Sequence, residues 1–147
     1  MNRLISISTR ISLLIFALVA VFVAKANSGS LDERFKATVN TAIHNVQQTE
    51  DPVAKRKMLG DFLTRMNQGL GMAKDAVSEK DRQALNVLQL KIQADYAELN
   101  GNGMMKVPDG ELNHFASYVQ QDVEQASGVY ISVVGLIIIL LLLIIIL

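Results

Sequence analysis

The 147-residue sequence carries 14 Lys and Arg residues against 14 Asp and Glu residues, so its formal net charge is zero. This balance produces no strong field toward nucleic acid, and we expect no nucleic-acid partner. The absence of cysteine excludes disulfides, thiolate metal sites and cysteine nucleophiles. Half of the residues are apolar, and they are concentrated at the two ends of the chain.

The N-terminal segment, residues 11–26, is apolar and is flanked by basic residues. Arg3 and Arg10 precede it, and by the positive-inside rule they hold residues 1–10 in the cytoplasm. The uncharged run from Ile11 to Ala24 would span only about 21 Å as a helix, which is short for a membrane crossing. The basic side chains at its two ends can reach the membrane surfaces and lengthen the usable span.

This segment has two interpretations. Its length suits the hydrophobic region of a signal peptide, and Ala24-Lys25-Ala26 fits the small-x-small cleavage pattern. The alternative is a signal-anchor that is retained as a transmembrane helix. Both predict that residues 27–127 form an extracytoplasmic domain at an integral membrane location, in the periplasm or outside a bacterial inner membrane.

Two amphipathic helices are predicted in the first half of that domain. Ser30 and Glu33 fit a capping box at the start of the first helix. Asp51 and Pro52 fit the N-cap and the first residue of the second. The spacing predicts buried stripes of Leu31, Phe35, Val39, Ala42, Ile43 and Val46, and then of Leu59, Phe62, Leu63, Met66, Leu70, Ala73 and Val77.

Two further helices are predicted in the second half. Ser78 begins the third helix, and Gly101-Asn102-Gly103 ends it. After a loop through Pro108, Asp109 is expected to cap the fourth. The predicted stripes are Leu85, Leu88, Ile92, Tyr96 and Leu99, and then Leu112, Phe115, Val119 and Val123.

Short connections favour antiparallel neighbours, so the predicted fold is all-α, an antiparallel four-helix bundle with one or two transmembrane helices. The turn at 78–81 would lie near the membrane. The turn at 50–52 and the loop at 101–109 would lie at the distal end. The alternative is a set of helices that does not close on itself and packs instead on partner subunits.

The C-terminal segment, residues 128–147, is predicted to be a transmembrane helix. It has no charged residue, and its last twelve residues are all Leu or Ile. The stretch from Val129 to Leu147 would be about 28 Å long as a helix, which matches the hydrocarbon core. We expect the fourth helix to run into it without a break. Ser132 and Gly135 are small and share one face, where they could form a helix–helix contact in the membrane. A glycolipid-anchor signal after Ala126-Ser127-Gly128 is the alternative, but a polar spacer is lacking.

The sequence offers no catalytic constellation, and we expect a non-enzymatic protein without cofactors or metal sites. His44 and His114 lack zinc-motif spacing. The acidic pairs Asp32-Glu33 and Glu50-Asp51 stand at helix starts, where carboxylates favour the helix dipole. Lys55, Arg56 and Lys57 form one basic cluster, which is interpreted as a solvated face or as a contact for an anion or an acidic partner.

The layout resembles the four-helix-bundle sensory module of bacterial chemoreceptors. The start Ile5-Ser6-Ile7-Ser8-Thr9-Arg10, followed by an apolar run, is similar in style, and the resemblance extends over most of the chain as architecture. It implies a periplasmic bundle between two spans. Chemoreceptors continue into a HAMP linker and a long cytoplasmic coiled coil, which do not follow Leu147 here, so the resemblance does not extend to cytoplasmic signalling. Because it includes no specific motif, no ligand-binding residue is carried over.

Two functions are therefore expected from different classes. The first is a structural or accessory subunit of a membrane assembly, whose partners are the lipid bilayer and other membrane-protein subunits or further copies of the chain. The alternative is a ligand-sensing or adaptor module of chemoreceptor type, for which the sequence does not name the small-molecule ligand.

Overall fold

The computed structural model describes residues 28–102 and 105–130, together with Ser132, Gly135 and Ile139. The described part is all-helical, which confirms the predicted all-α class. In chain order its elements are α2 (Ser28–Gln48), α3 (Pro52–Ala73), α4 (Glu79–Asn100), the 3₁₀ helix η1 (Asp109–Glu111) and α5 (Leu112–Tyr130).

Both predicted membrane spans fall largely beyond this part. The N-terminal span at 11–26 lies outside the described residues, as does most of the C-terminal span at 128–147. Among the helices that are described, none combines the length and the apolar character needed to cross a bilayer.

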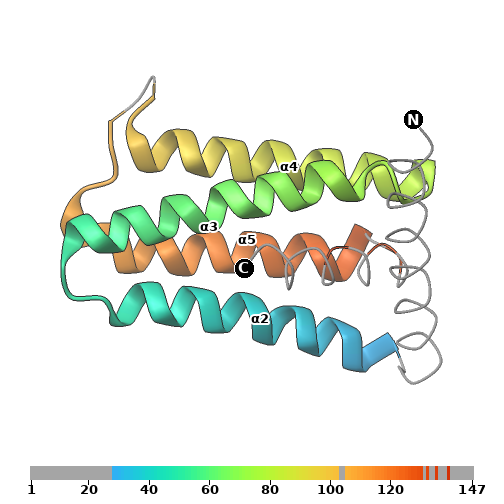
Figure 1. Ribbon diagram of the computed structural model, residues 1–147, viewed down its shortest axis with the longest axis horizontal. Helices are drawn as coiled ribbons and strands as arrows, with labels where there is room; N and C mark the ends of the chain where they lie inside the picture. Colours follow the sequence, from blue (N-terminus) through green and yellow to red (C-terminus); the bar gives the residue numbers. More distant parts are fainter. Residues whose placement is uncertain (1–27, 103–104, 131, 133–134, 136–138, 140–147) are drawn as a thin grey trace, which may run out of the picture.

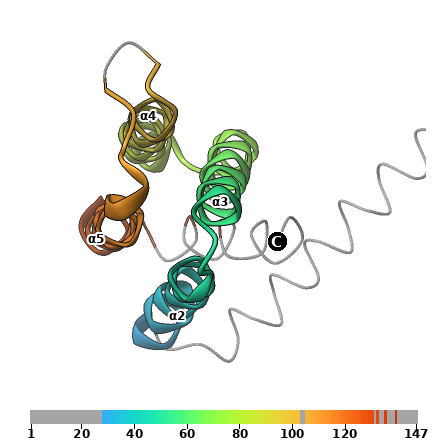
Figure 2. The same cartoon turned by 90° about the vertical axis from the view of Figure 1, so that its left-hand side faces the viewer.

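The four α-helices run antiparallel to one another in chain order (Figure 1). α3 packs chiefly on α4, and α2 chiefly on α5, so that each helix occupies one corner of the bundle in the end-on view of Figure 2. The α3–α4 turn lies at the same end as the start of α2 and the end of α5. The α2–α3 turn and the connection from α4 to η1 lie at the other end, as predicted.

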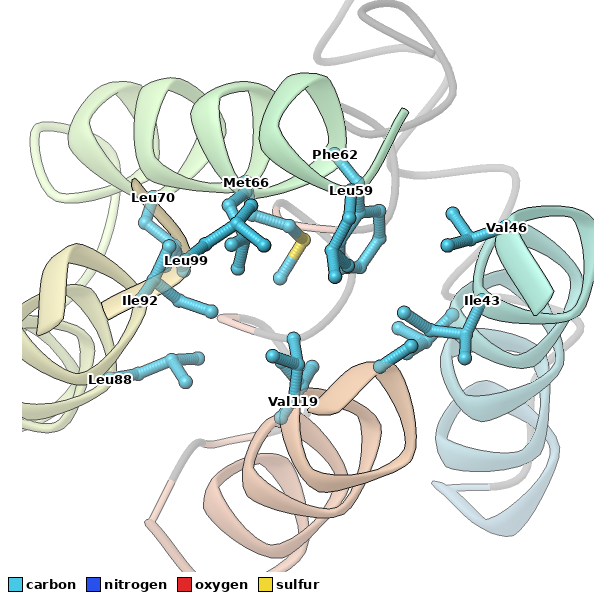
Figure 3. Close-up of a cluster of buried hydrophobic side chains, with 14 of the residues drawn as sticks. Ile43, Val46, Leu59, Phe62, Met66, Leu70, Leu88, Ile92, Leu99 and Val119 are labelled. Carbon is cyan, nitrogen blue, oxygen red and sulfur yellow. The ribbon is translucent and has the colours of Figure 1, made fainter. Parts of the chain in front are cut away.

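The predicted apolar stripes meet in a single core, so the bundle closes on itself. Figure 3 shows side chains from all four helices pointing into the same space. The core continues to Ile139, which lies beyond α5 and is fully buried. The labelled members are Ile43 and Val46 of α2, Leu59, Phe62, Met66 and Leu70 of α3, Leu88, Ile92 and Leu99 of α4, and Val119 of α5.

Local signals set the start of α3 and both ends of α4 as predicted, whereas α3 ends at Ala73, before the predicted stripe residue Val77. The Asp51 carboxylate accepts hydrogen bonds from the backbone N–H groups of Val53 and Ala54, and Pro52 occupies the first helical turn. Ser78 accepts from the Asp81 N–H at the start of α4. Gly101 ends α4 with a φ of 74°, a left-handed conformation that favours glycine. A Cβ there would also approach the Lys106 side chain to 2.9 Å.

Three further expected helix boundaries are wrong. α2 begins at Ser28, so Ser30 lies inside the helix rather than at its N-cap. Asp109 makes no side-chain cap and belongs to η1, because its carboxylate is engaged by Arg56 of α3. α5 ends at Tyr130, and Ser132 is not helical, so the fourth helix does not continue unbroken into the C-terminal segment.

Candidate functional site

A charged cluster lies in the seam between α4 and α5. The Lys91 ammonium of α4 donates to the Asp122 carboxylate of α5 across 2.6 Å. Asp95 stands one helical turn after Lys91 on α4 and is only 3% exposed, and Asp122 is only 6% exposed. Within the described part of the chain, neither Asp95 Oδ2 nor Asp122 Oδ2 has a hydrogen-bond partner. Two buried carboxylates therefore lie near one lysine, which binds Asp122 directly and attracts Asp95 electrostatically.

The electrostatics of this seam follow from burial. Burial disfavours the charged form of Asp95, the nearby Asp122 charge adds to this effect, and together they raise the pKa of Asp95 to about 6 despite the attraction of Lys91. The hydrogen bond from Lys91 to Asp122 raises the pKa of Lys91, although burial opposes it. The Asp122 charge and burial also raise the pKa of Tyr118, one turn earlier on α5. The chemistry available here is the binding of a proton.

The sequence contained a signal for this cluster that the stripe assignment missed. Asp95 stands three residues after Ile92 and four before Leu99, which is a core position of α4. The predicted stripe has Tyr96 at that position. It is instead 40% exposed and lies beside Gly60 of α3, with its ring edge at the border of the core. A charged residue that has the three- and four-residue spacing of the apolar core positions therefore indicates a buried charged cluster.

A solvent-open cavity of about 860 Å³ adjoins this seam at the end of the bundle that carries the α2–α3 turn. Phe115 and Val107 are its buried apolar residues, and Tyr118 borders it. The rings of Phe115 and Tyr118 are tilted by 35°, with centroids 6.2 Å apart. The cavity combines this apolar surface with charged residues of both signs. Its lining consists of Glu98, Met105, Lys106, Val107, Pro108, Glu111, His114, Phe115 and Tyr118.

The three residues of the predicted basic cluster have different contacts. Arg56 turns inward: its guanidinium donates to the backbone carbonyls of Leu99 and Val107, both at 2.6 Å, and to Asp109 Oδ1 at 2.7 Å. Lys57 pairs with Asp61 on the exposed face of α3. Lys55 is half-buried. The three residues therefore do not present one continuous basic surface, and Arg56 acts as a clamp between α3 and the connection that follows α4.

Ser132 makes contacts that sequence reasoning did not foresee. Its backbone N–H donates to Asp81 Oδ1 at 2.9 Å, and its hydroxyl donates to Asp81 Oδ2 at 2.5 Å. The Gly135 N–H donates back to the Ser132 hydroxyl oxygen. Burial opposes ionisation of Asp81, but these bonds and one from Ser78 outweigh it and lower its pKa. The residue just past α5 is thereby tied to the start of α4.

The remaining candidate residues do not converge. His44 is exposed on α2, and His114 is exposed at the cavity on α5. Among the residues described, no three His, Cys, Asp or Glu side chains gather in a way that could hold a metal ion.

Comparison with known proteins gives no relative. No family model matches the chain, and neither a curated protein nor a solved structure resembles it significantly.

Proposed function

We propose that the chain is a non-enzymatic integral membrane protein that presents its helical bundle outside the cytoplasm as a structural or accessory subunit of a membrane assembly. One observation carries this proposal. The start of α2 and the end of α5 lie at the same end of the bundle (Figure 1). Both apolar flanks of the sequence therefore adjoin the same end of the bundle, from which both can enter one bilayer. Insertion of the C-terminal flank would take Ile139 out of the core in which it is buried.

The contacts of Ser132 support the same orientation. They hold the beginning of the Leu- and Ile-rich tail beside the α3–α4 turn. The distal end then carries the α2–α3 turn, the Arg56 clamp and the cavity. A bundle of this kind can position binding surfaces at a fixed height above the membrane.

Membrane integration and assembly are tested together in the full chain. We expect the protein to stay in the membrane pellet after an alkaline wash. After mild solubilisation and crosslinking, it should run in complexes larger than a single chain. A chain that is released by the wash would instead assign the tail to the bundle core, where Ile139 is buried. A chain that runs strictly alone would contradict the accessory-subunit role.

The alternative is a ligand-sensing or adaptor module, and the cavity beside the α4–α5 seam is what favours it. A small molecule that occupies this cavity would contact α5 and the segment from Met105 to Pro108. In that case, a small-molecule library should contain compounds that raise the Tm of the full chain. Tyr118→Ala should abolish that rise, whereas Thr64→Ala on the exposed face of α3 should preserve it. A rise that Tyr118→Ala leaves unchanged would count against this cavity as the sensing site.

A further inference from the structure

α4 has an exposed stripe that its own bundle does not use. Val87 is 63% exposed and Leu90 is 67% exposed, although both are large and apolar. They belong to a series separated by four, three, four and three residues, which we call the outer stripe of α4. It consists of Gln83, Val87, Leu90, Ala94 and Ala97. This spacing is the heptad repeat of a two-stranded coiled coil.

The neighbours of the outer stripe show that it points away from the bundle. On one side, Lys91 reaches α5 and binds Asp122. On the other side, the Gln93 amide donates to Asn67 of α3. The stripe runs between these two positions. Figure 2 shows α4 at a corner of the bundle with α3 and α5 as its neighbours, so the remaining side of α4 faces outward.

We infer that the outer stripe of α4 docks on the same stripe of a second copy of this chain, forming a parallel, two-fold symmetric helix pair. This rests on the proposed membrane anchoring, because two copies in one membrane stand side by side in the same orientation. In a parallel pair each position of the stripe meets itself. Each residue of the stripe then contacts the identical residue of the second copy. A charged residue would meet a like charge, so the stripe must be uncharged.

The two large apolar residues of the stripe fit that arrangement. In heptad terms Val87 is at a and Leu90 at d, and a β-branched residue at a with Leu at d favours a parallel dimer. None of the five stripe positions is charged. Lys80 would occupy the next position toward the membrane-proximal end, where it would face its own copy, so the stripe begins at Gln83.

The flanking positions are also compatible with a second copy. In a parallel pair, Asn86 of one chain faces Lys91 of the other, and Gln93 faces Glu98. Each pair joins an amide to a charge, so no like charges oppose each other. The exposed face of α3 offers no comparable uncharged stripe, because the charged residues Lys57, Asp61 and Arg65 follow one another along it. Only two large apolar residues lie in the stripe, so we expect weak association that depends on the high local concentration in a membrane.

The absence of cysteine makes the test direct. Single cysteines are introduced into the full chain at each stripe position and, as flanking controls, at Asn86 and Gln93. Thr64→Cys, on the exposed face of α3, is the control for random collision. Alkali-washed membranes are then mildly oxidised, and disulfide-linked dimer is measured. A disulfide requires Cα atoms about 4.4–6.8 Å apart, so only residues that meet their own copy should crosslink efficiently.

We expect a dimer yield that follows the heptad spacing, with the stripe positions about fivefold or more above the flanking positions and Thr64→Cys. Leu90→Lys in the Ala94→Cys background should lower the yield by a similar factor, whereas Thr64→Lys should leave it unchanged. Equal yields at all positions would overturn the inference, as would crosslinking confined to the middle of the stripe, which indicates antiparallel pairing. Retention in the washed membrane is scored separately, so a failure of anchoring is distinguishable from a failure of dimerisation.

Discussion

Asp95→Asn is expected to stabilise the protein, raising the free energy of unfolding by roughly 1 to 2 kcal/mol at about pH 7.5 after allowance for solvent screening. The carboxylate is nine-tenths buried, and its Oδ2 has no partner among the described residues. Asparagine keeps the size of the side chain, removes the charge and supplies an amide donor close to Asp122. The substitution thereby removes the charge that burial and, to a smaller extent, the Asp122 charge disfavour.

The same substitution predicts a specific pH dependence. The pKa of Asp95 rises from 3.8 to about 6 on folding. The folded state therefore binds this proton more tightly than the unfolded chain does. The contribution of Asp95 to stability is fully present below about pH 3.8 and is lost as the pH rises through about 6. The difference between Asp95→Asn and the original chain should be largest above about pH 6 and should shrink toward about pH 4.

Urea unfolding of the full chain in a mild detergent, at several pH values between about 4 and 7.5, measures both effects. Asp75→Asn is the matched control, because Asp75 is exposed in the turn after α3 and should give a difference near zero. A less stable Asp95→Asn variant at neutral pH would mean that attraction to Lys91 outweighs burial and the Asp122 charge. Asp81 changes the stability of both proteins equally, since its lowered pKa is common to them.

Asp95 also shows where sequence reasoning reached its limit. The middle helices were predicted well because their signals are local: Asp51, Pro52, Ser78 and Gly101 act on residues within a turn of themselves. Stripe spacing places the core to within one residue, and positions 95 and 96 both satisfy it in α4. Because tyrosine is the more apolar residue, the pattern favours Tyr96 for the core position. Its partly exposed ring instead packs its apolar part against the bundle and leaves its hydroxyl in water.

The contacts that sequence could not supply are long-range. The capping role expected of Asp109 fails because Arg56, 53 residues earlier, binds its carboxylate. The bonds between Ser132 and Asp81 join residues that are 51 apart. Neither contact leaves a periodic pattern in the sequence. The candidate site has the same origin, because the seam requires α4 and α5 to be adjacent before Lys91 can meet Asp122.

Among these long-range contacts, we expect those of Arg56 to contribute most to the free energy of unfolding. Arg56→Met is expected to lower the free energy of unfolding by about 2 to 4 kcal/mol, because it removes three charge-assisted hydrogen bonds and leaves two carbonyls without their donor. The Arg56 side chain is only 13% exposed, so water cannot fully replace it. Arg56→Lys should recover part of the loss, since an ammonium keeps the charge but not the planar fork.

Lys57→Met is the matched control, because it removes the next basic residue of the same cluster. Its pair with Asp61 is exposed on both sides, and we expect a change of about 0.5 kcal/mol or less. Urea unfolding gives the two energies, and hydrogen exchange locates their cause. Arg56→Met should increase exchange at the Val107 amide, which bonds to the Glu98 carbonyl beside the clamp. Equal losses for the two variants would assign the basic cluster to surface electrostatics. A loss confined to Arg56→Met would show that this one residue holds the connection between α4 and η1, which also lines the cavity.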